Sequence, residues 1–234
     1  HKAIRRQRQM CIRDRNTVAT RDARLLRQQM DIINRLPKDY VFLNYLRCHD
    51  DIGWGLDYGW LGQFGIDEVA HKKYLSDFFT GKYENSFARG ELYNADPASG
   101  DARQCGTTAS LCGIEKAAYE KDEEATKRAI RYDLTLHAYM LTQSGIPVIY
   151  SGDEIGQEND YTYHEDPKKW EDSRICTEEI FSGIKRNFVI QKVPFQEKCL
   201  KDCQSWRQSG NRIRYSRVPQ TAEQWIPGMI LSLV

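Results

Sequence analysis

The sequence has few of the features that mark membrane, secreted or nucleic-acid-binding proteins. Its 34 lysines and arginines balance 33 acidic residues to a net charge of +1, so no excess charge attracts nucleic acid or an anionic membrane. No apolar run approaches the roughly 20 residues that a membrane-spanning helix needs. No apolar stretch follows the basic N-terminus, so we do not interpret it as a signal peptide. We therefore expect no nucleic-acid and no membrane partner.

The cysteines are too scattered to indicate a disulfide framework or a zinc site. There are seven of them, an odd number, and none forms the closely spaced pair of a metal-binding motif. This pattern favours free thiols in a reducing compartment and predicts a cytoplasmic protein. Cys199 and Cys203 would share one helix face, but no histidine lies near them to complete a metal site. We expect neither a metal nor an organic cofactor.

The first segment, residues 1–15, differs from the rest of the chain. It carries six lysines and arginines and no apolar period, which is typical of a disordered basic arm. Residues 10–15 read MCIRDR, which is also the translation of a common sequencing adapter. We interpret residues 1–15 as a non-native leader and begin the fold at Asn16.

Residues 16–174 have the pattern of a globular α/β segment. Apolar residues at helical spacing, short β-branched runs and glycine or proline breaks define its elements. The predicted order is a helix over 20–36, a buried strand over 40–46, a long loop over 53–106 with a helical stretch near 71–79, helices over 107–119 and 123–143, and a buried strand over 146–150.

This order fits either a (β/α)8 barrel or a doubly wound sheet. Both strands are followed by long polar loops, and barrel active sites are built from such loops at the carboxyl ends of the strands. We therefore favour an α/β fold that is a partial (β/α)8 TIM barrel. Residues 53–106 would then be a long inserted loop subdomain between the two strands.

Charged side chains follow both predicted strands. His49, Asp50 and Asp51 come directly after the first, and Arg103 and Arg174 lie in later loops. A carboxylate at this position can strengthen its hydrogen bond to a sugar hydroxyl as the ring becomes oxocarbenium-like, and arginine can bind neighbouring hydroxyls. Taken alone, each of these groups also fits a solvated loop.

Four strings in order resemble motifs of glycoside hydrolase family 13, in the form found in amylosucrases. They are YVFLNYLRCHDDIGW, SFARGELYNADPASGDARQCGTTASL, SGIPVIYSGDEIGQEND and EDSR, and the resemblance covers residues 16–174, about two-thirds of the chain. It implies that the two predicted strands are barrel strands seven and eight. It also implies that Asp50 stabilises the transition state and that His49 contacts the glucosyl ring. It also implies that Asp51 and Arg103 line the fructosyl side of a sucrose site and that Arg174 reaches the glucosyl pocket.

The resemblance further implies a retaining glucosyl transfer from sucrose to an α-glucan, by double displacement. The family's nucleophile and acid/base follow barrel strands four and five, whereas the matching segment starts at the helix after strand six. We therefore expect the chain alone to be inactive. A sucrose or α-glucoside hydrolase or phosphorylase of the same family is an alternative. A noncatalytic carbohydrate-binding remnant, or a reading frame without a role of its own, is another.

Residues 175–234 lose both the amphipathic periodicity and the family pattern. A back-translation of residues 175–186 with one inserted base reads YLHRGDFQWDKA, which resembles the family's continuation. We hypothesise that this tail is translated out of frame and lacks a stable core.

Overall fold

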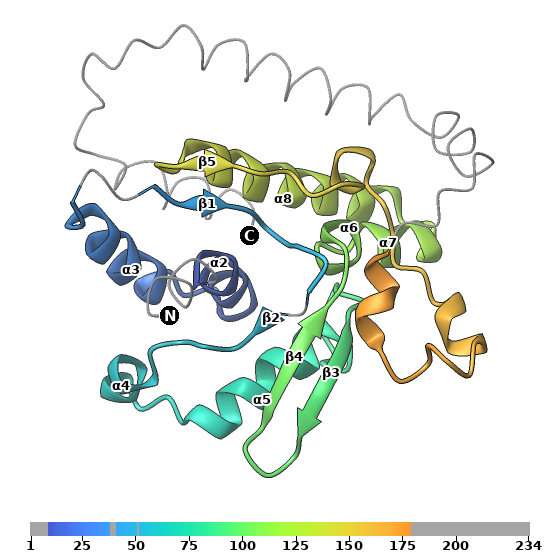
Figure 1. The fold of residues 1–234 in the computed structure, drawn as a ribbon, viewed down its shortest axis with the longest axis horizontal. Helices are drawn as coiled ribbons and strands as arrows, with labels where there is room; N and C mark the ends of the chain where they lie inside the picture. The colour runs from blue at the N-terminus through green and yellow to red at the C-terminus, as the bar shows by residue number, and fades with distance from the viewer. Residues whose placement is uncertain (1–8, 38–40, 51, 179–234) are drawn as a thin grey trace, which may run out of the picture. The chain divides into compact units, whose positions relative to one another are not determined.

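The computed structural model describes residues 9–37, 41–50 and 52–178, and in this part the chain is a mixed α/β protein (Figure 1). These residues belong to one compact unit. The tail predicted for residues 175–234 lies outside the described residues except for its first four. Within the described part, no helix is both long and apolar enough to cross a membrane.

Two consecutive helices begin the described chain, α2 (Gln9–Thr20) and α3 (Arg24–Asn34). Helix α3 matches the helix predicted for residues 20–36, and it buries Leu25 and Leu26. Helix α2 crosses the boundary that we placed between residues 15 and 16, and it buries Ile12 in the main core. Helix α2 shows no amphipathic pattern in the sequence, because polar residues occupy most of its buried positions.

The first and last strands form a two-stranded parallel sheet. Strand β1 (Leu43–Asn44) pairs with β5 (Ile146–Pro147), with Leu43 opposite Ile146. The connection ends in the long helix α8 (Glu123–Thr142), which Asp122 caps by accepting a hydrogen bond from the Ala125 amide at 2.9 Å. Figure 1 shows α8 running alongside this sheet. Parallel strands joined through a helix are the arrangement expected from the predicted order.

The prediction that both strands are buried was wrong. Leu43 is 46% exposed and Ile146 is 54% exposed, and both strands are shorter than predicted. A parallel strand is usually buried because elements cover both faces of its sheet. The apolar composition of these two strands is typical of strands covered on both faces. Among the described residues, no element covers the face that carries Leu43 and Ile146.

Between β1 and α8, the predicted long loop is a folded insert. Its three-stranded antiparallel sheet has the order β2-β4-β3. Trp54 stacks on Phe79 at 5.6 Å between ring centroids, inside the main hydrophobic core. The elements of the insert are β2 (Ile52–Gly53), α4 (Tyr58–Leu61), η1 (Gly62–Phe64), α5 (Glu68–Phe79), β3 (Glu91–Asp96) and β4 (Asp101–Cys105). Helix α5 contains the stretch predicted near residues 71–79, whereas the β3–β4 hairpin was not predicted.

The helix predicted for residues 107–119 is two short helices, α6 (Thr108–Leu111) and α7 (Ile114–Glu120). They are separated at Gly113, whose φ of 92° is strained for any residue with a side chain. A side chain there would also meet Phe87 at 2.9 Å. The chain must turn at this point so that α7 can pack on α8.

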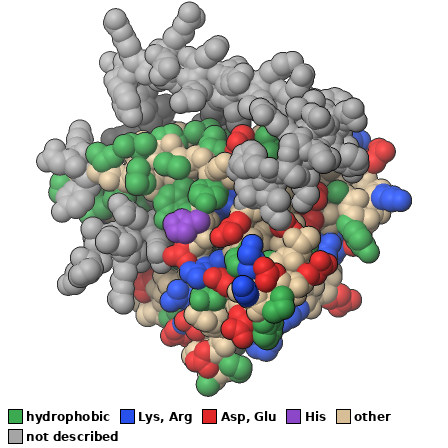
Figure 2. Space-filling model, turned by 45° about the vertical axis from the view of Figure 1, so that its right-hand side comes forward, with side chains coloured by type: hydrophobic (Ala, Val, Ile, Leu, Met, Phe, Trp, Pro, Cys, Tyr) green, Lys and Arg blue, Asp and Glu red, His purple; other side chains and the backbone are tan. Residues whose placement is uncertain are grey.

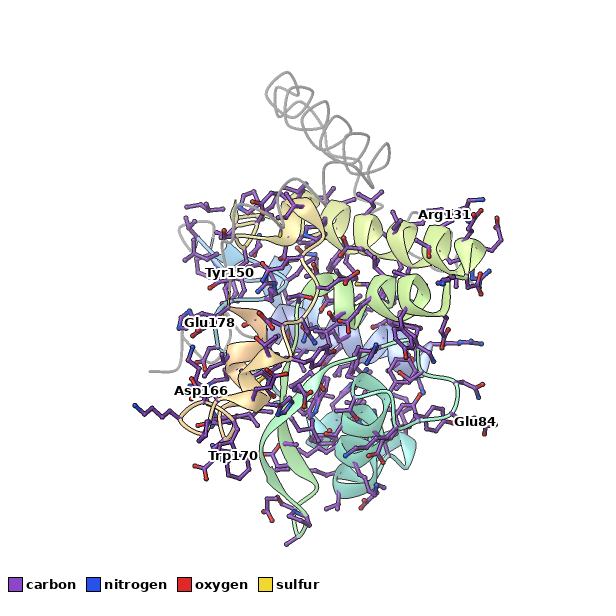
Figure 3. The ribbon with its side chains drawn as sticks, turned by 90° about the vertical axis from the view of Figure 1, so that its right-hand side faces the viewer. Glu84, Arg131, Tyr150, Asp166, Trp170 and Glu178 are labelled. Atoms are coloured by element: carbon purple, nitrogen blue, oxygen red, sulfur yellow. The ribbon has the colours of Figure 1, made fainter. Side chains whose placement is uncertain are left out.

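After β5 the chain runs along one side of the molecule, as the labelled residues Tyr150, Asp166, Trp170 and Glu178 show in Figure 3. Between β5 and residue 178, the described chain forms the 3-10 turns η2 (Asp153–Ile155), η3 (Thr162–Glu165) and η4 (Ser173–Thr177). Asn159 fixes it to the rest of the fold, accepting from the Thr107 amide at 2.8 Å and donating to the Arg89 carbonyl at 2.7 Å.

Candidate functional site

Asp50 and Arg174 lie together, although 124 residues separate them in the chain. The Arg174 Nη1 donates to Asp50 Oδ1 at 3.5 Å. Asp50 follows β1, and Arg174 belongs to η4. Both side chains are partly exposed. The loops after β1 and after β5 therefore meet at this point, as expected for loops that follow adjacent parallel strands.

Asp172 holds the other edge of the Arg174 guanidinium. Arg174 donates from Nε to Asp172 Oδ1 at 2.8 Å and from Nη2 to Oδ2 at 2.7 Å. Asp172 also caps η4 by accepting from the Arg174 backbone amide at 3.1 Å. The hydrogen bonds from Arg174 lower the pKa of Asp172, and the same bonds raise the pKa of Arg174. This bidentate contact fixes the guanidinium plane and leaves Nη1 directed at Asp50.

Tyr93 connects these groups with Arg103. The Arg174 guanidinium lies 4.6 Å from the centroid of the Tyr93 ring. Tyr93 on β3 is directly opposite Arg103 on β4, so their side chains share one face of the hairpin. Gly53 on β2 is opposite Arg103 on its other side, and it has no side chain to cover that residue. The exposed Arg103 thus flanks the same aromatic ring as Arg174.

The structure says less about the other two predicted site residues, His49 and Asp51. His49 is exposed beside Asp50, and Asp51 lies outside the described residues. Sequence reasoning missed Tyr93 and Asp172 as members of the cluster. Both stand in the quoted motif strings, Asp172 in EDSR and Tyr93 in SFARGELYNADPASGDARQCGTTASL, and could have been considered there.

A buried ion pair between Arg47 and Asp153 lies close to the cluster in the sequence of the loop that carries Asp50. Arg47, three residues before Asp50, donates from Nε to Asp153 Oδ1 at 2.6 Å, and both side chains are almost fully buried. Arg47 also donates to the Ser151 carbonyl at 3.0 Å. Thr108 donates to Asp153 Oδ1 at 3.1 Å. Burial raises the pKa of Asp153, and the charge of Arg47 opposes that rise. The pair ties the end of β1 to the loop after β5.

His137 on α8 carries a second buried charge in this region. Burial by itself lowers its pKa, but the hydrogen bond to the Asp133 side chain and the Asp133 charge together raise it to about 9. Its Nδ1 lies 3.5 Å from Asp133 Oδ1. His137 is therefore protonated at neutral pH, and its charge also acts favourably on Asp153.

The side chains of Asp50, Tyr93, Arg103, Asp172 and Arg174 are all at least partly exposed. Two small pockets in the described part of the chain are lined by other residues. Figure 2 shows acidic and basic side chains interspersed over much of the described surface. An aromatic ring, guanidinium donors and a carboxylate can bind a sugar by stacking and hydrogen bonds. A retaining hydrolysis needs a nucleophile and an acid, and in the described part Asp172 is already bound to Arg174.

Metal binding has no support in the described residues, since no group of three or more histidine, cysteine or acidic side chains converges there. Within the described part, Cys48, Cys105, Cys112 and Cys176 form no disulfide bond. Comparison of the sequence with the models of known protein families gives no match.

Proposed function

We propose that the chain is the carboxyl-terminal part of a (β/α)8 barrel from an amylosucrase-like enzyme of glycoside hydrolase family 13. Such an enzyme transfers the glucosyl unit of sucrose to an α-glucan. The observation that supports this best is the contact between Asp50 and Arg174 at 3.5 Å, from loops that follow two adjacent parallel strands. The resemblance assigns both residues to the glucosyl pocket, so it predicts that they lie near each other.

In this proposal Asp50 stabilises the positive charge that develops on the glucosyl ring. Arg174, held by Asp172 and resting on Tyr93, donates to ring hydroxyls, and Arg103 binds the fructosyl side. The covalent step and the proton transfer belong to carboxylates of preceding barrel units. The chain by itself therefore binds sugar weakly at most and does not cleave it.

The test joins the first six βα units of an amylosucrase to residues 16–174 and the frame-restored tail. We expect this single-chain fusion to release fructose from sucrose. Replacing Asp50 with Asn should lower the rate by about 10²-fold or more, because the group acts mainly in the transition state. Asp31→Asn, at an exposed position of α3, is the matched control and should leave the rate unchanged. A folded fusion without fructose release would contradict the proposal.

The acceptor decides between the transferase and its alternatives. Release of glucose and fructose in equal amounts without glucan growth would indicate a hydrolase, and a requirement for inorganic phosphate would indicate a phosphorylase. A noncatalytic carbohydrate-binding remnant is a second candidate, because the partly exposed Tyr93 ring and Arg174 guanidinium can bind a sugar without any covalent chemistry. Sugar binding by the chain together with an inactive fusion would favour that candidate.

A further inference from the structure

A small pocket lies where helices α2 and α3 meet the start of the insert. Its lining includes residues of α2 and α3, of α4 and η1, and of α5. Gln28 on α3 donates to Asp57, the cap residue of α4, at 3.3 Å, and α3 and α4 lie near each other in Figure 1. We call this site the α2–α5 pocket. None of its lining residues belongs to the cluster around Asp50 and Arg174, so it is a separate site.

Two buried polar atoms of the pocket residues have no hydrogen-bond partner among the described residues. Asn16 on α2 is 3% exposed, and its Oδ1 accepts no hydrogen bond. The Nε2 of His71 on α5 is also buried and unpartnered, although the Nδ1 of the same ring lies 3.3 Å from the Tyr58 hydroxyl. Buried polar atoms without partners cost free energy. A bound group that hydrogen-bonds to both atoms would offset that cost.

The pocket favours a neutral ligand over an ion. Its most deeply buried side chains besides Asn16 are the apolar Leu25 and Leu61. Burial lowers the pKa of His71, so the ring is neutral at neutral pH. The charged lining residues Asp22 and Arg24 are paired with each other at 2.5 Å. An ion that entered the pocket would lose its water without gaining an opposite free charge.

An aromatic wall and a small inner space define the shape of the ligand. Trp60 and Phe64 are in edge-to-face contact, with 4.8 Å between ring centroids, and the Arg24 guanidinium lies over the Phe64 ring at 4.2 Å. The partly exposed Trp60 can contact the carbon skeleton of a ligand. The inner volume of about 20 Å³ is roughly that of one or two water molecules. A hydroxymethyl group has this size, and its hydroxyl both donates and accepts.

We propose that the α2–α5 pocket binds a small neutral sugar or polyol, and that one hydroxymethyl arm of the ligand enters it. The hydroxyl donates to Asn16 Oδ1. With the Tyr58 hydroxyl donating to His71 Nδ1, the hydrogen of the ring is on Nε2, which donates to the same ligand oxygen. The rest of the ligand lies against Trp60. This binding is independent of the proposed glucosyl transfer, because it uses none of the residues assigned to that reaction.

The test titrates the full 234-residue chain with glucose and follows the Trp60 indole and His71 ring signals by NMR. We expect saturable shifts of both signals. Xylose is glucose without the hydroxymethyl group, and it should bind about tenfold more weakly or worse, because it cannot place an arm in the pocket. Asn16→Leu and, independently, Trp60→Leu should each weaken glucose binding by about tenfold or more, through loss of the acceptor and of the aromatic contact.

Asn34→Leu, at an exposed position of α3, and Trp170→Leu, at an exposed position that does not line the pocket, are the matched controls. Both should bind glucose like the unchanged chain, and circular dichroism should show that all four variants fold. Trp60 is partly exposed, so its variant tests the pocket even if Asn16→Leu does not fold.

The proposal is overturned if glucose causes no saturable shift, if xylose binds as well as glucose, or if folded pocket variants bind unchanged. It is also overturned if sodium acetate or ammonium chloride binds here and glucose does not. Shifts confined to the signals of Tyr93 would support sugar binding at the Asp50–Arg174 cluster and refute the pocket. Glucose binding at the pocket together with an inactive fusion would support the pocket and contradict the proposed function.

Discussion

The buried side chain of Asp14 on helix α2 allows a direct test of how this helix packs against the rest of the fold. Its side chain is buried, and among the described residues its Oδ1 has no hydrogen-bond partner. It lines a small pocket with Leu46, Leu111 and Leu136. Burial raises its pKa to about 6, although the neighbouring Arg15 and Arg13 charges partly oppose the rise. An ionised carboxylate in such a place destabilises the folded state.

The magnitude follows from the pKa. A rise from the model-compound value of 3.8 to about 6 corresponds to about 3 kcal/mol of lost stability once the carboxylate is ionised. Between these values the folded chain binds more protons at Asp14 than the unfolded chain does. The contribution of Asp14 to the unfolding free energy therefore falls as the pH rises from about 4 to about 6, and then stays constant.

Urea unfolding at several pH values measures this effect. Asp14→Asn should remove the part of the pH dependence that lies between pH 4 and pH 6. Asp14→Leu should stabilise the chain by about 3 kcal/mol at pH 7, because it also places an apolar group in an apolar pocket. Asp31→Asn, at an exposed position of α3, is the control. Equal stability of Asp14→Leu and the unchanged chain at pH 7 would refute the burial of Asp14.

Three further substitutions test the buried polar contacts. His137 should titrate near pH 9 by NMR. Its raised pKa stabilises the folded chain fully below about pH 6.5, and this stabilisation is lost as the pH rises through 9. His137→Gln should therefore cost about 3 kcal/mol of unfolding free energy at pH 6 and almost nothing at pH 10. Arg47→Met should cost about 3–5 kcal/mol in urea unfolding by leaving Asp153 unpaired, and the double variant with Asp153→Asn should recover part of that loss. Asn159→Ala should cost about 2 kcal/mol, since the Thr107 amide and the Arg89 carbonyl lose their partners, and exchange of the Thr107 amide should accelerate.

The sequence predicted the elements whose capping residues and apolar pattern match their place in the fold. Helix α8 has an aspartate cap at Asp122 and a glycine–proline end after Gln143, and it was placed within one residue. The β3–β4 hairpin was missed, because its strands read ELYNAD and DARQC and are too polar to show a clear alternation. Helix α2 was also missed because its buried positions are polar. Arg13, Asp14 and Arg15 are buried in spite of their charge, so no apolar periodicity marks the helix.

The candidate site was predicted as a set of residues but not as a geometry. The motif strings selected Asp50 and Arg174, and the structure brings them into contact. The orienting contact from Asp172 and the ring of Tyr93 depend on the conformation of η4 and on the register of the hairpin. Neither is readable from residue spacing, because each involves residues that are close only after folding.

The insert between β1 and β5 also has a consequence for how the chain folds. Leu43 and Ile146 pair across about 100 intervening residues, so the parallel ladder closes a long loop and carries a large entropic cost. The β3–β4 hairpin and the α7–α8 pair close over a few residues each. Contacts between distant residues form late and slow the overall rate. We therefore expect the insert and α8 to fold before β5 pairs with β1 and completes the parallel sheet.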